Sequence, residues 1–426
     1  MSIKNELKVG IIGLGYVGLP LARLMAQRYP TVGFDINPVR VEKLKGGTDW
    51  TGELTSEEMA ALLQNPHFAL STDIEELSSC TVYIVAVPTP VDVDNRADLQ
   101  PLRQASVLVG TVLKPGDLVI YESTVYPGVT EEECVPCLVR SSGLRYNTDF
   151  CVGYSPERVN PGDRLHTVET ICKLTSGSTP EAARRVDELY RSVLKEGGTF
   201  PVSSIRVAEA AKIIENTQRD VNIAFMNELA KIFNAMGIDT REVIAAASTK
   251  WNFIPMQPGL VGGHCIGIDP YYLIQKAQVY GVMPRVISEA RRLNDGMGEY
   301  VANQVVRLMN KRNIRVKGSR ILILGFAFKE NCPDTRNTKV ADVYSNLKEF
   351  TSDITVYDPW VDAADVKTVY GITITQEVPA GPFDAIVLAV AHSVFSTLDY
   401  PALKGPKGVI YDVKGLLPRG QVDARL

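Results

Sequence analysis

The stretch GLVGGHCIGIDPYYL (259–273) contains the side chain best suited to covalent chemistry, the thiol of Cys265. A cysteine thiolate is an effective nucleophile near neutral pH. The glycines before it, Gly262 among them, allow the backbone to lie close to a ligand. Asp269 precedes a proline and is typical of the N-cap of a helix, here over 271–280. Asp269 is also a candidate for proton transfer, and the two roles are compatible.

Lys212 and Asn216 are four positions apart in a segment, 206–236, that has no Gly or Pro and has apolar residues at helical spacing. The spacing predicts one long helix that ends at Gly237. Residues four apart share a helix face, so an ammonium and an amide can serve together as donors to a developing oxyanion. A polar face in water is the competing interpretation of the pair taken alone.

A glycine pattern, Gly13-Leu-Gly15-Tyr-Val-Gly18, follows the apolar run Val9 to Ile12 and precedes a helical stretch. This context predicts a dinucleotide site, in which the glycines permit a tight turn, close approach of the pyrophosphate and close helix packing. Asp35 ends the next predicted strand, where a carboxylate accepts from ribose hydroxyls and repels a 2′-phosphate. The pattern therefore favours NAD over NADP.

Together these groups indicate one class of reaction. A bound NAD accepts hydride from an alcohol without help from a thiol, but oxidation of the resulting aldehyde needs a nucleophile that turns it into a hydride donor. A thiolate does so by forming a thiohemiacetal, whose oxidation gives a thioester that water hydrolyses. Cys265 is placed for this role.

The elements that position these residues form two alternating series. Short β-branched runs alternate with helical patterns up to about residue 200, which indicates a parallel sheet with crossover helices. After a second helical stretch (286–312) and a connector (313–319), strand patterns return. The expected strands are 8–12, 31–34, 82–87, 118–121, 150–154, 320–325, 354–357, 385–389 and 409–412.

We therefore expect an α/β protein with two Rossmann-like doubly wound parallel-sheet domains joined by a long central helical spine. The expected domains are an NAD-binding Rossmann domain (1–202), a central helical domain with the nucleophile loop (203–312), which is a candidate for dimerisation, and a C-terminal Rossmann-like domain (313–426). The spine is a candidate dimer interface or, alternatively, is buried within one chain. VGFDINP (32–38) and TVYDPW (355–360) form a faint internal echo, in which an acid ends an early strand of each sheet.

Composition excludes several classes of function. The chain has 426 residues and a formal net charge of −4, so it has no basic field for nucleic acid. No apolar run is long enough to span a bilayer, and no signal peptide is evident, so we expect a cytoplasmic protein. Seven scattered cysteines do not form a disulfide framework, and four histidines without paired spacing predict no metal site.

Several long motifs resemble the UDP-glucose/GDP-mannose dehydrogenase family of nucleotide-sugar 6-dehydrogenases, over residues 8 to about 415. They are GLGYVGLP (13–20), VPTP (87–90), ESTVYPG (122–128), YSPERVNPG (154–162), AEAAKIIENTQRDVNIAFMNE (208–228), GGHCIGIDPYYL (262–273) and GFAFKENCPDTRNTK (325–339).

The resemblance implies oxidation of C6 of a UDP-sugar to the acid with two NAD, usually by a homodimer. It also implies that the C-terminal domain (313–426) binds the UDP-sugar. Cys265 would be the nucleophile, Lys212 and Asn216 would stabilise oxyanions, and Glu157, Asp269 and Thr124 would handle protons and water. The residues implied to bind NAD are Gly13, Gly15, Tyr16, Val17, Gly18, Asp35, Arg40, Thr89, Thr124 and Arg336. Those implied to bind UDP-sugar are Glu157, Arg158, Val159, Lys212, Asn216, Gly259, Gly262, Lys329 and Lys414.

Departures within the motifs bear on the sugar. GGHCIG replaces the FGGSCF-like motif of UDP-glucose dehydrogenases, and STKWNFIPMQPG (248–259) replaces an arginine-bearing loop. These segments are similar instead to UDP-N-acetylhexosamine 6-dehydrogenases of bacterial capsule and O-antigen synthesis. UDP-GlcNAc and UDP-GalNAc are both open as substrates, with UDP-ManNAc and UDP-glucose as less favoured alternatives. Lys414 stands in place of a family arginine for the substrate.

Two other classes of function remain open at this point. A two-electron hydroxyacid dehydrogenase would share the glycine pattern and a lysine–asparagine pair, but it would not use Cys265. An inactive NAD-binding protein would keep the glycines and helices without the chemistry. The presence of Cys265, Lys212, Asn216 and Asp269 argues against an inactive protein.

Overall fold

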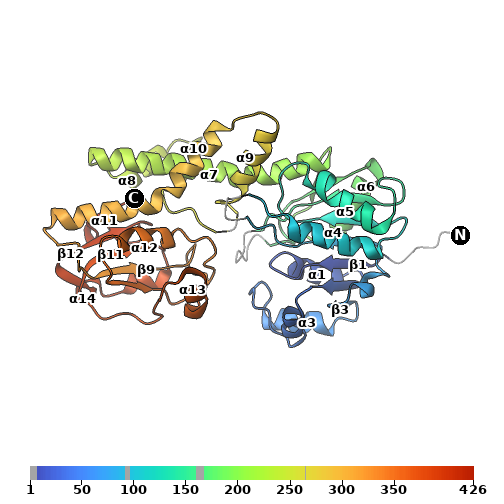
Figure 1. Ribbon diagram of the computed structural model, residues 1–426, viewed down its shortest axis with the longest axis horizontal. Coiled ribbons are helices and arrows are strands. Elements are labelled where there is room, and N and C mark those ends of the chain that lie inside the picture. The colour runs from blue at the N-terminus through green and yellow to red at the C-terminus, as the bar shows by residue number, and fades with distance from the viewer. Residues whose placement is uncertain (1–6, 92–95, 160–166, 264) are drawn as a thin grey trace. The chain divides into compact units, whose positions relative to one another are not determined.

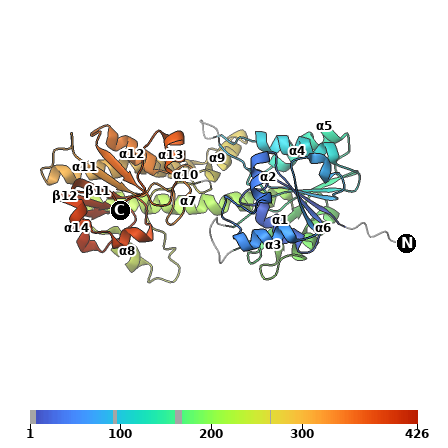
Figure 2. The same ribbon diagram turned by 90° about the horizontal axis from the view of Figure 1, so that it is seen from below.

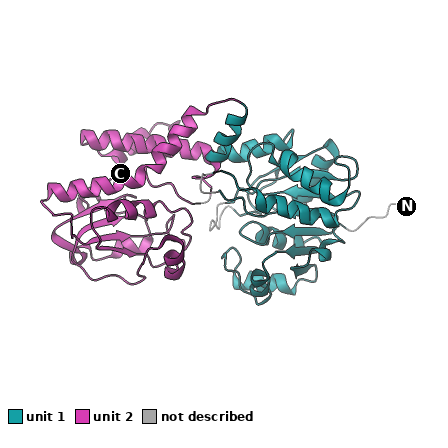
Figure 3. Ribbon diagram, viewed as in Figure 1, with its two compact units in different colours: residues 1–215, 271–280 teal, residues 216–270, 281–426 magenta. Residues whose placement is uncertain are grey.

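The computed structural model describes residues 7–91, 96–159, 167–263 and 265–426 and contains two compact units (Figure 1 and Figure 3). Unit 1 comprises residues 1–215 and 271–280, and unit 2 comprises residues 216–270 and 281–426. The long helix α7 (Ile205–Met236) begins in unit 1 and ends in unit 2. Each unit is built around its own sheet.

The sheet of unit 1 has eight strands in the order β3-β2-β1-β4-β5-β6-β7-β8. Its pairs are parallel except β6 with β7, which are antiparallel. The five strands expected in this half are present, and β3, β7 and β8 were missed because each carries polar or exposed residues. The strands are β1 Val9–Ile12, β2 Thr31–Phe34, β3 Phe68–Ser71, β4 Val82–Val85, β5 Leu118–Tyr121, β6 Cys151–Tyr154, β7 Lys173–Gly177 and β8 Thr199–Pro201.

Helices cover both faces of this sheet (Figure 2). Apolar residues of α4 and α5 pack on one face, and those of α1, α3 and α6 pack on the other. The result is the doubly wound arrangement that the alternation predicts. The helices are α1 Gly18–Ala26, α2 Pro38–Lys45, α3 Ser56–Gln64, α4 Gln100–Val112, α5 Val135–Ser142, α6 Pro180–Arg191 and α9 Asp269–Val279, with short turns η1 Ile74–Leu77 and η2 Thr130–Cys134.

Helix α7 confirms the prediction of one long helix that ends at Gly237, which has a φ of +75°. The apolar stripe that identified it does not face the core of the chain, because Val207, Ile214 and Phe225 are between 44% and 54% exposed. A spine buried wholly within one chain is therefore wrong. Among the helices of the described residues, none has the length and apolar character needed to cross a membrane.

Unit 2 has a five-stranded parallel sheet in the order β10-β9-β11-β12-β13. One face packs against α11, α12 and α13, and η3 and α14 cover the other. The strands are β9 Ile321–Leu324, β10 Ile354–Tyr357, β11 Phe383–Leu388, β12 Lys404–Asp412 and β13 Ala424–Arg425. The helices are α8 Thr240–Ala247, α10 Arg285–Asp295, α11 Met297–Lys311, α12 Val340–Lys348, α13 Ala363–Tyr370 and α14 Tyr400–Leu403, with short turns η3 Ser393–Thr397 and η4 Arg419–Gln421.

The internal echo between the two sheets is real at the level of the backbone. Gly13 and Gly325 have φ angles of +93° and +91°, and each follows the first strand of its sheet. Asp358 ends β10 as Asp35 ends β2, but Asp358 is fully buried and its Oδ2 lies 3.0 Å from Nε2 of His392. Burial alone would raise the pKa of Asp358, but hydrogen bonds from His392 and two amides lower it overall.

The helical stretch expected over 286–312 is two helices, α10 and α11, that are separated at Gly296. The next glycine along, Gly298, has a packing reason: a Cβ there would lie 2.6 Å from Cβ of Asp342 on α12. Close contact between α11 and α12 therefore depends on a glycine. The break at Gly296 was not predicted, because the helical spacing of apolar residues continues across it.

Glu209 fixes the first turns of α7 to the rest of unit 1. Its carboxylate accepts hydrogen bonds from the backbone N–H of Gly128 at 2.6 Å and of Thr130 at 2.9 Å. The side chain is fully buried. Burial raises the pKa of Glu209 to about 7, although these hydrogen bonds oppose the rise.

The folded protein should therefore hold a proton on Glu209 at pH values where the unfolded chain has lost it. The stability from this proton is fully present below the pKa of an unfolded glutamic acid and is lost as pH rises through about 7. We expect the free energy of unfolding of Glu209→Gln, relative to the natural protein, to increase between pH 5 and pH 8 in urea titrations. The control Glu196→Gln removes an exposed carboxyl of the same unit, and an equal trend in that variant would contradict the assignment.

Candidate active site

The carboxyl edge of the sheet in unit 1 gathers residues that the sequence placed in separate motifs. The glycine loop follows β1, Asp35 follows β2, Thr89 follows β4, Thr124 follows β5 and Glu157 follows β6. Strands β1 and β4 are neighbours, and from them the chain runs outward in opposite directions. This reversal of strand order is where doubly wound sheets bind ligands.

The glycine loop has the shape that a dinucleotide pyrophosphate requires. Gly13 adopts a φ of +93°, and its N–H donates to the carbonyl of Phe34 at 2.8 Å. A Cβ at Gly18 would lie 1.7 Å from the carbonyl oxygen of Gly13, whereas a Cβ at Gly15 would meet nothing within 4 Å. Gly18 thus serves packing and Gly15 leaves open space, so the loop fits NAD.

Asp35 and Arg40 hold the same residue of this loop from two sides. Asp35 Oδ2 accepts from the N–H of Leu14 at 2.9 Å, and Arg40 Nη2 donates to the carbonyl of Leu14 at 2.7 Å. Arg40 is buried and forms an ion pair with Asp49 at 2.8 Å. It is therefore not a solvated surface arginine, and in this structure it shapes the glycine turn.

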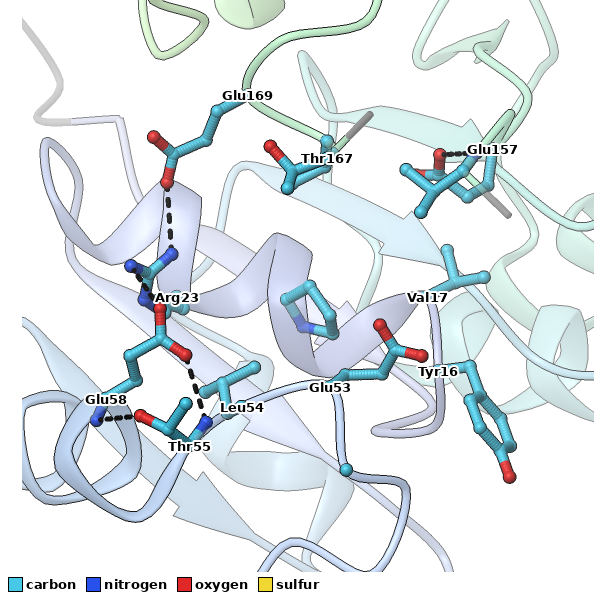
Figure 4. A pocket seen from close by; sticks show the side chains of 14 residues that line it. Tyr16, Val17, Arg23, Glu53, Leu54, Thr55, Glu58, Glu157, Thr167 and Glu169 are labelled. Carbon is cyan, nitrogen blue, oxygen red and sulfur yellow. Dashed lines mark hydrogen bonds and ion pairs between the residues drawn. The ribbon is translucent and has the colours of Figure 1, made fainter. Parts of the chain in front are cut away.

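A cavity of about 420 Å³ opens beside the glycine loop in unit 1 (Figure 4). Tyr16 and Val17, expected to contact NAD, line it together with Glu157 and Val159, expected to contact the substrate. In Figure 4 Glu53, which also lines the cavity, lies beside Tyr16. Two sets of residues from distant motifs therefore share one surface.

The loops after β4 and β5 are tied to each other. Thr89 Oγ1 donates to the carbonyl of Thr124 at 2.7 Å, and Ser123 Oγ donates to the carbonyl of Val87 at 2.6 Å. The hydroxyl of Tyr272, on α9, donates to the carbonyl of Thr89. The VPTP and ESTVYPG motifs thus form one supported surface at the edge of the sheet.

In unit 2, the glycines before Cys265 allow close backbone packing. A Cβ at Gly262 would lie 2.7 Å from the carbonyl oxygen of Asn337, and a Cβ at Gly263 would lie 2.8 Å from the ring of Phe328. The nucleophile loop therefore lies against the 325–339 motif. Cys265 is exposed, and its carbonyl accepts from the N–H of Asp269 at 2.9 Å.

Asn216 and Asp269 are brought together in unit 2. The amide Nδ2 of Asn216 donates to Oδ2 of Asp269 at 2.6 Å, and Asp269 is buried. Helix α9 begins at Asp269, so this residue is the first of the helix and the N-cap assignment was wrong by one position. Its charge at the helix N-terminus is still favourable. Lys212 is also buried and lies four positions before Asn216 on α7.

Three residues expected to bind the substrate line one narrow cavity of about 10 Å³ in unit 2: Gly262, Lys329 and Lys414. Lys414 lies 4.0 Å from Glu330. Arg336, expected to contact NAD, is in the same unit, where its guanidinium pairs with Asp334. Arg158, in unit 1, pairs with Glu215 at 2.8 Å.

Gly259 is held by a residue that the sequence reasoning missed. The side-chain amide of Asn227 on α7 accepts from the N–H of Gly259 at 2.8 Å and donates to its carbonyl at 3.0 Å. The side-chain amide of Asn294 donates to the backbone carbonyl and to Oδ1 of Asp220, which is also on α7. Asn227 lies on the buried face of α7 together with other polar residues, among them Lys212 and Asp220, so helical periodicity gave no signal for it.

A second missed group lies at the carboxyl edge in unit 1. Lys173 on β7 is fully buried between the carboxylates of Glu122 and Glu157. Glu122 belongs to the ESTVYPG motif, but nothing near it in the sequence indicates a buried cation. All seven cysteines are described, and none of them forms a disulfide.

The two glycines of the loop should respond differently to alanine. Gly18→Ala forces a carbon against the Gly13 carbonyl and should lower the free energy of unfolding by about 1–3 kcal/mol. Gly15→Ala meets no atom and should change it by less than about 0.5 kcal/mol, yet weaken NAD binding at least about tenfold. Urea unfolding and NAD titration of both variants check this. Unchanged NAD affinity in Gly15→Ala would contradict the assigned binding surface.

Comparison with known proteins identifies the family. Residues 7–194, 206–296 and 322–419 match the NAD-binding, central and UDP-binding domains of the UDP-glucose/GDP-mannose dehydrogenase family. UDP-N-acetyl-D-glucosamine 6-dehydrogenase of Pseudomonas aeruginosa is 54% identical over 425 residues, 99% of this chain and 100% of that protein. The Salmonella typhi protein of the same name is 52% identical over 425 residues, 99% of each chain.

The similarity extends to solved structures. The structure of UDP-D-ManNAc dehydrogenase from Pyrococcus horikoshii superposes with a TM-score of 0.88 at 30% sequence identity, covering 98% of each chain. Three matching domains in the family's order and full-length identity above 50% leave no doubt about ancestry. The chain belongs to the UDP-glucose/GDP-mannose dehydrogenase family.

Proposed function

We propose that this protein oxidises C6 of a UDP-N-acetylhexosamine, UDP-GlcNAc or its epimer UDP-GalNAc, to the uronic acid for bacterial surface polysaccharide. The observation that carries the proposal is the turn in unit 2 that places Cys265 beside the hydrogen-bonded pair Asp269 and Asn216. That turn occurs in a chain 54% identical to a UDP-GlcNAc 6-dehydrogenase over its whole length.

NAD is the cofactor, since residues 7–194 match the NAD-binding domain of the family. When bound it accepts one hydride in each of the two oxidation steps. The residues proposed to hold it are those that the glycine pattern and the resemblance indicate, and the open space at Gly15 and the carboxylate of Asp35 support this. The preference for NAD over NADP rests on Asp35.

The covalent chemistry is assigned to Cys265. Its thiolate adds to the C6 aldehyde and forms a thiohemiacetal, which loses a hydride to become a thioester. Water then attacks the thioester, releasing the carboxylate and restoring the thiol. Lys212 and Asn216 donate to the oxyanion in these steps. Asp269, Glu157 and Thr124 are proposed to move protons and hold water.

The remaining parts of the proposal concern assembly and location. Exposed apolar residues along α7, including Phe225 and Ile232, support a homodimer through the spine. A groove of about 750 Å³ between α7 and α10, lined partly by Phe225 and Val286, supports the same interface. The three-part division at residues 202 and 312 is proposed with it. Seven cysteines without a disulfide fit a reducing cytoplasm.

The reaction stoichiometry tests the four-electron oxidation. With UDP-GlcNAc or UDP-GalNAc, we expect two NADH for each uronic acid released, measured by absorbance and by mass spectrometry of the sugar nucleotide. UDP-glucose, UDP-ManNAc and NADP serve as comparison reactants and should be poorer. One NADH with accumulation of the aldehyde would favour a two-electron dehydrogenase, and no turnover would favour an inactive binding protein.

Replacement of the nucleophile tests the thiol. Cys265→Ser should abolish net release of uronic acid, because a serine ester is hydrolysed far more slowly than the natural thioester is formed and broken. Cys172→Ser changes the other exposed cysteine and should retain turnover. Assays of both variants under saturating substrate and NAD check this. Full turnover by Cys265→Ser would remove the thiol from the mechanism.

A further inference from the structure

A buried cluster of charges lies at the carboxyl edge of the sheet in unit 1. The ammonium of Lys173 is 2.6 Å from Oε2 of Glu122 and 3.5 Å from Oε2 of Glu157. It also donates to the carbonyl of Pro156 at 3.4 Å. The hydroxyl of Tyr190 donates to the other oxygen of Glu122. The proposed chemistry uses Glu157 alone of these groups.

The sheet topology places these groups together. Strands β5 and β6 are parallel, so Glu122 and Glu157, which follow them, lie at the same edge. Strand β7 runs antiparallel to β6, with Gly153 opposite Gly177 and Tyr154 opposite Ser176. Continuing that register by three residues puts Glu157 opposite Lys173. The antiparallel pairing of β6 with β7 therefore places the ammonium of Lys173 beside Glu157.

The contacts of Glu157 are with two backbone N–H donors and a cation. Its Oε1 accepts from the N–H of Arg158 at 2.6 Å and of Val159 at 2.7 Å, while Oε2 faces Lys173. Both oxygens of the carboxylate thus have donors or a cation, and neither contact requires a proton on it. Glu157 also lines the 420 Å³ cavity, so it is the member of the cluster that reaches the site.

Other charged residues around Glu157 contribute to the net charge that the ammonium of Lys173 offsets. Glu122 on the loop after β5 competes for the same ammonium, and Tyr190 on α6 donates to Glu122. Arg158 is engaged by Glu215 on α7, and Glu53 lines the same cavity. Burial raises the pKa of Glu122 to about 7, with the charge of Glu157 adding to the rise and Lys173 opposing it.

We propose that Lys173 is a positioning residue that supplies the countercharge for Glu157 and fixes its carboxylate at the cavity, with Glu122 as a second acid that shares the same cation. The inference rests on the proposed function, in which Glu157 handles protons during oxidation at C6. Lys173 is fully buried, so it would act on the site through Glu157 and not by direct contact with substrate or cofactor. Burial alone would lower the pKa of Lys173, but the two carboxylates raise it overall, which keeps the cation in place.

The pH dependence of kcat/KM for UDP-GlcNAc or UDP-GalNAc tests this. Lys173→Met leaves the buried Glu122 and the partly buried Glu157 without a cation, so the acidic limb should move upward by roughly one to three pH units. Glu122→Gln removes the competing acid and should leave the limb in place or move it downward. The double variant Lys173→Met with Glu122→Gln keeps one acid and should have a limb between those of Lys173→Met and the natural protein.

Lys114→Met is the matched control, because Lys114 precedes the same strand β5 at its opposite end and lies 3.4 Å from Asp117. It should not move the limb. A purely structural role for Lys173 would lower activity at every pH without moving the limb, and that result would overturn the inference. If Lys173→Met does not fold, the acidic limb of the double variant is compared with that of the natural protein instead, and an unchanged limb would overturn the inference.

The inference can fail separately from the proposed function. Absence of oxidation by the natural protein would overturn the proposed function. The ionisation of Glu157 would then be read from the infrared carboxyl band that Glu157→Gln removes, followed against pH in the natural protein and in the Lys173 variants. A band that titrates at the same pH with and without Lys173 would overturn the inference.

Discussion

Parallel pairing of β1, β4, β5 and β6 is the constraint on which the site in unit 1 depends. Parallel strands start at one edge of a sheet and end at the other, so each loop that leaves a carboxyl end arrives at the same crevice. The glycine turn, the VPTP loop, the ESTVYPG loop and the PERV segment are far apart in the chain and adjacent in space. A single exception, the antiparallel strand β7, brings Lys173 back to that edge.

Close approach of backbone is the second recurring device. At Gly18 and Gly262 an added Cβ would lie 1.7 Å and 2.7 Å from a carbonyl oxygen. The first contact tightens the glycine turn that is proposed to face the dinucleotide, and the second sets the nucleophile loop against the 325–339 motif. In both units a functional loop owes its shape to the absence of a side chain, and polar side chains such as Asp35, Arg40 and Asn227 then hold that shape.

Much of this architecture could be predicted because local pattern and tertiary role coincide. Strand β2 was predicted at its observed bounds, and Asp35 at its end, because β-branched and acidic residues mark a buried strand and its ribose-facing terminus. The break between helices at Gly296 and the start of α9 at Asp269 were not predicted, because periodicity locates helices better than it locates their ends. The burial of Arg40 and of the Lys173 cluster could not be predicted, because each depends on partners that only the folded sheet supplies.

The burial of Asp358 and its pairing with His392 have a consequence for the order of events in the proposed reaction. Asp35 in the first sheet and Asp358 in the second both accept hydrogen bonds from backbone amides, but Asp358 is in addition fully buried and paired with His392. Within the described residues, the second sheet thus has the scaffold of a dinucleotide-binding fold with its ribose anchor already taken. Under the proposed oxidation, both hydrides are transferred at the cofactor site proposed for unit 1. The first reduced cofactor must therefore be exchanged for NAD before the aldehyde intermediate can be oxidised. In the proposed mechanism, the covalent bond to the sulfur of Cys265 would keep a reactive aldehyde from escaping during the exchange.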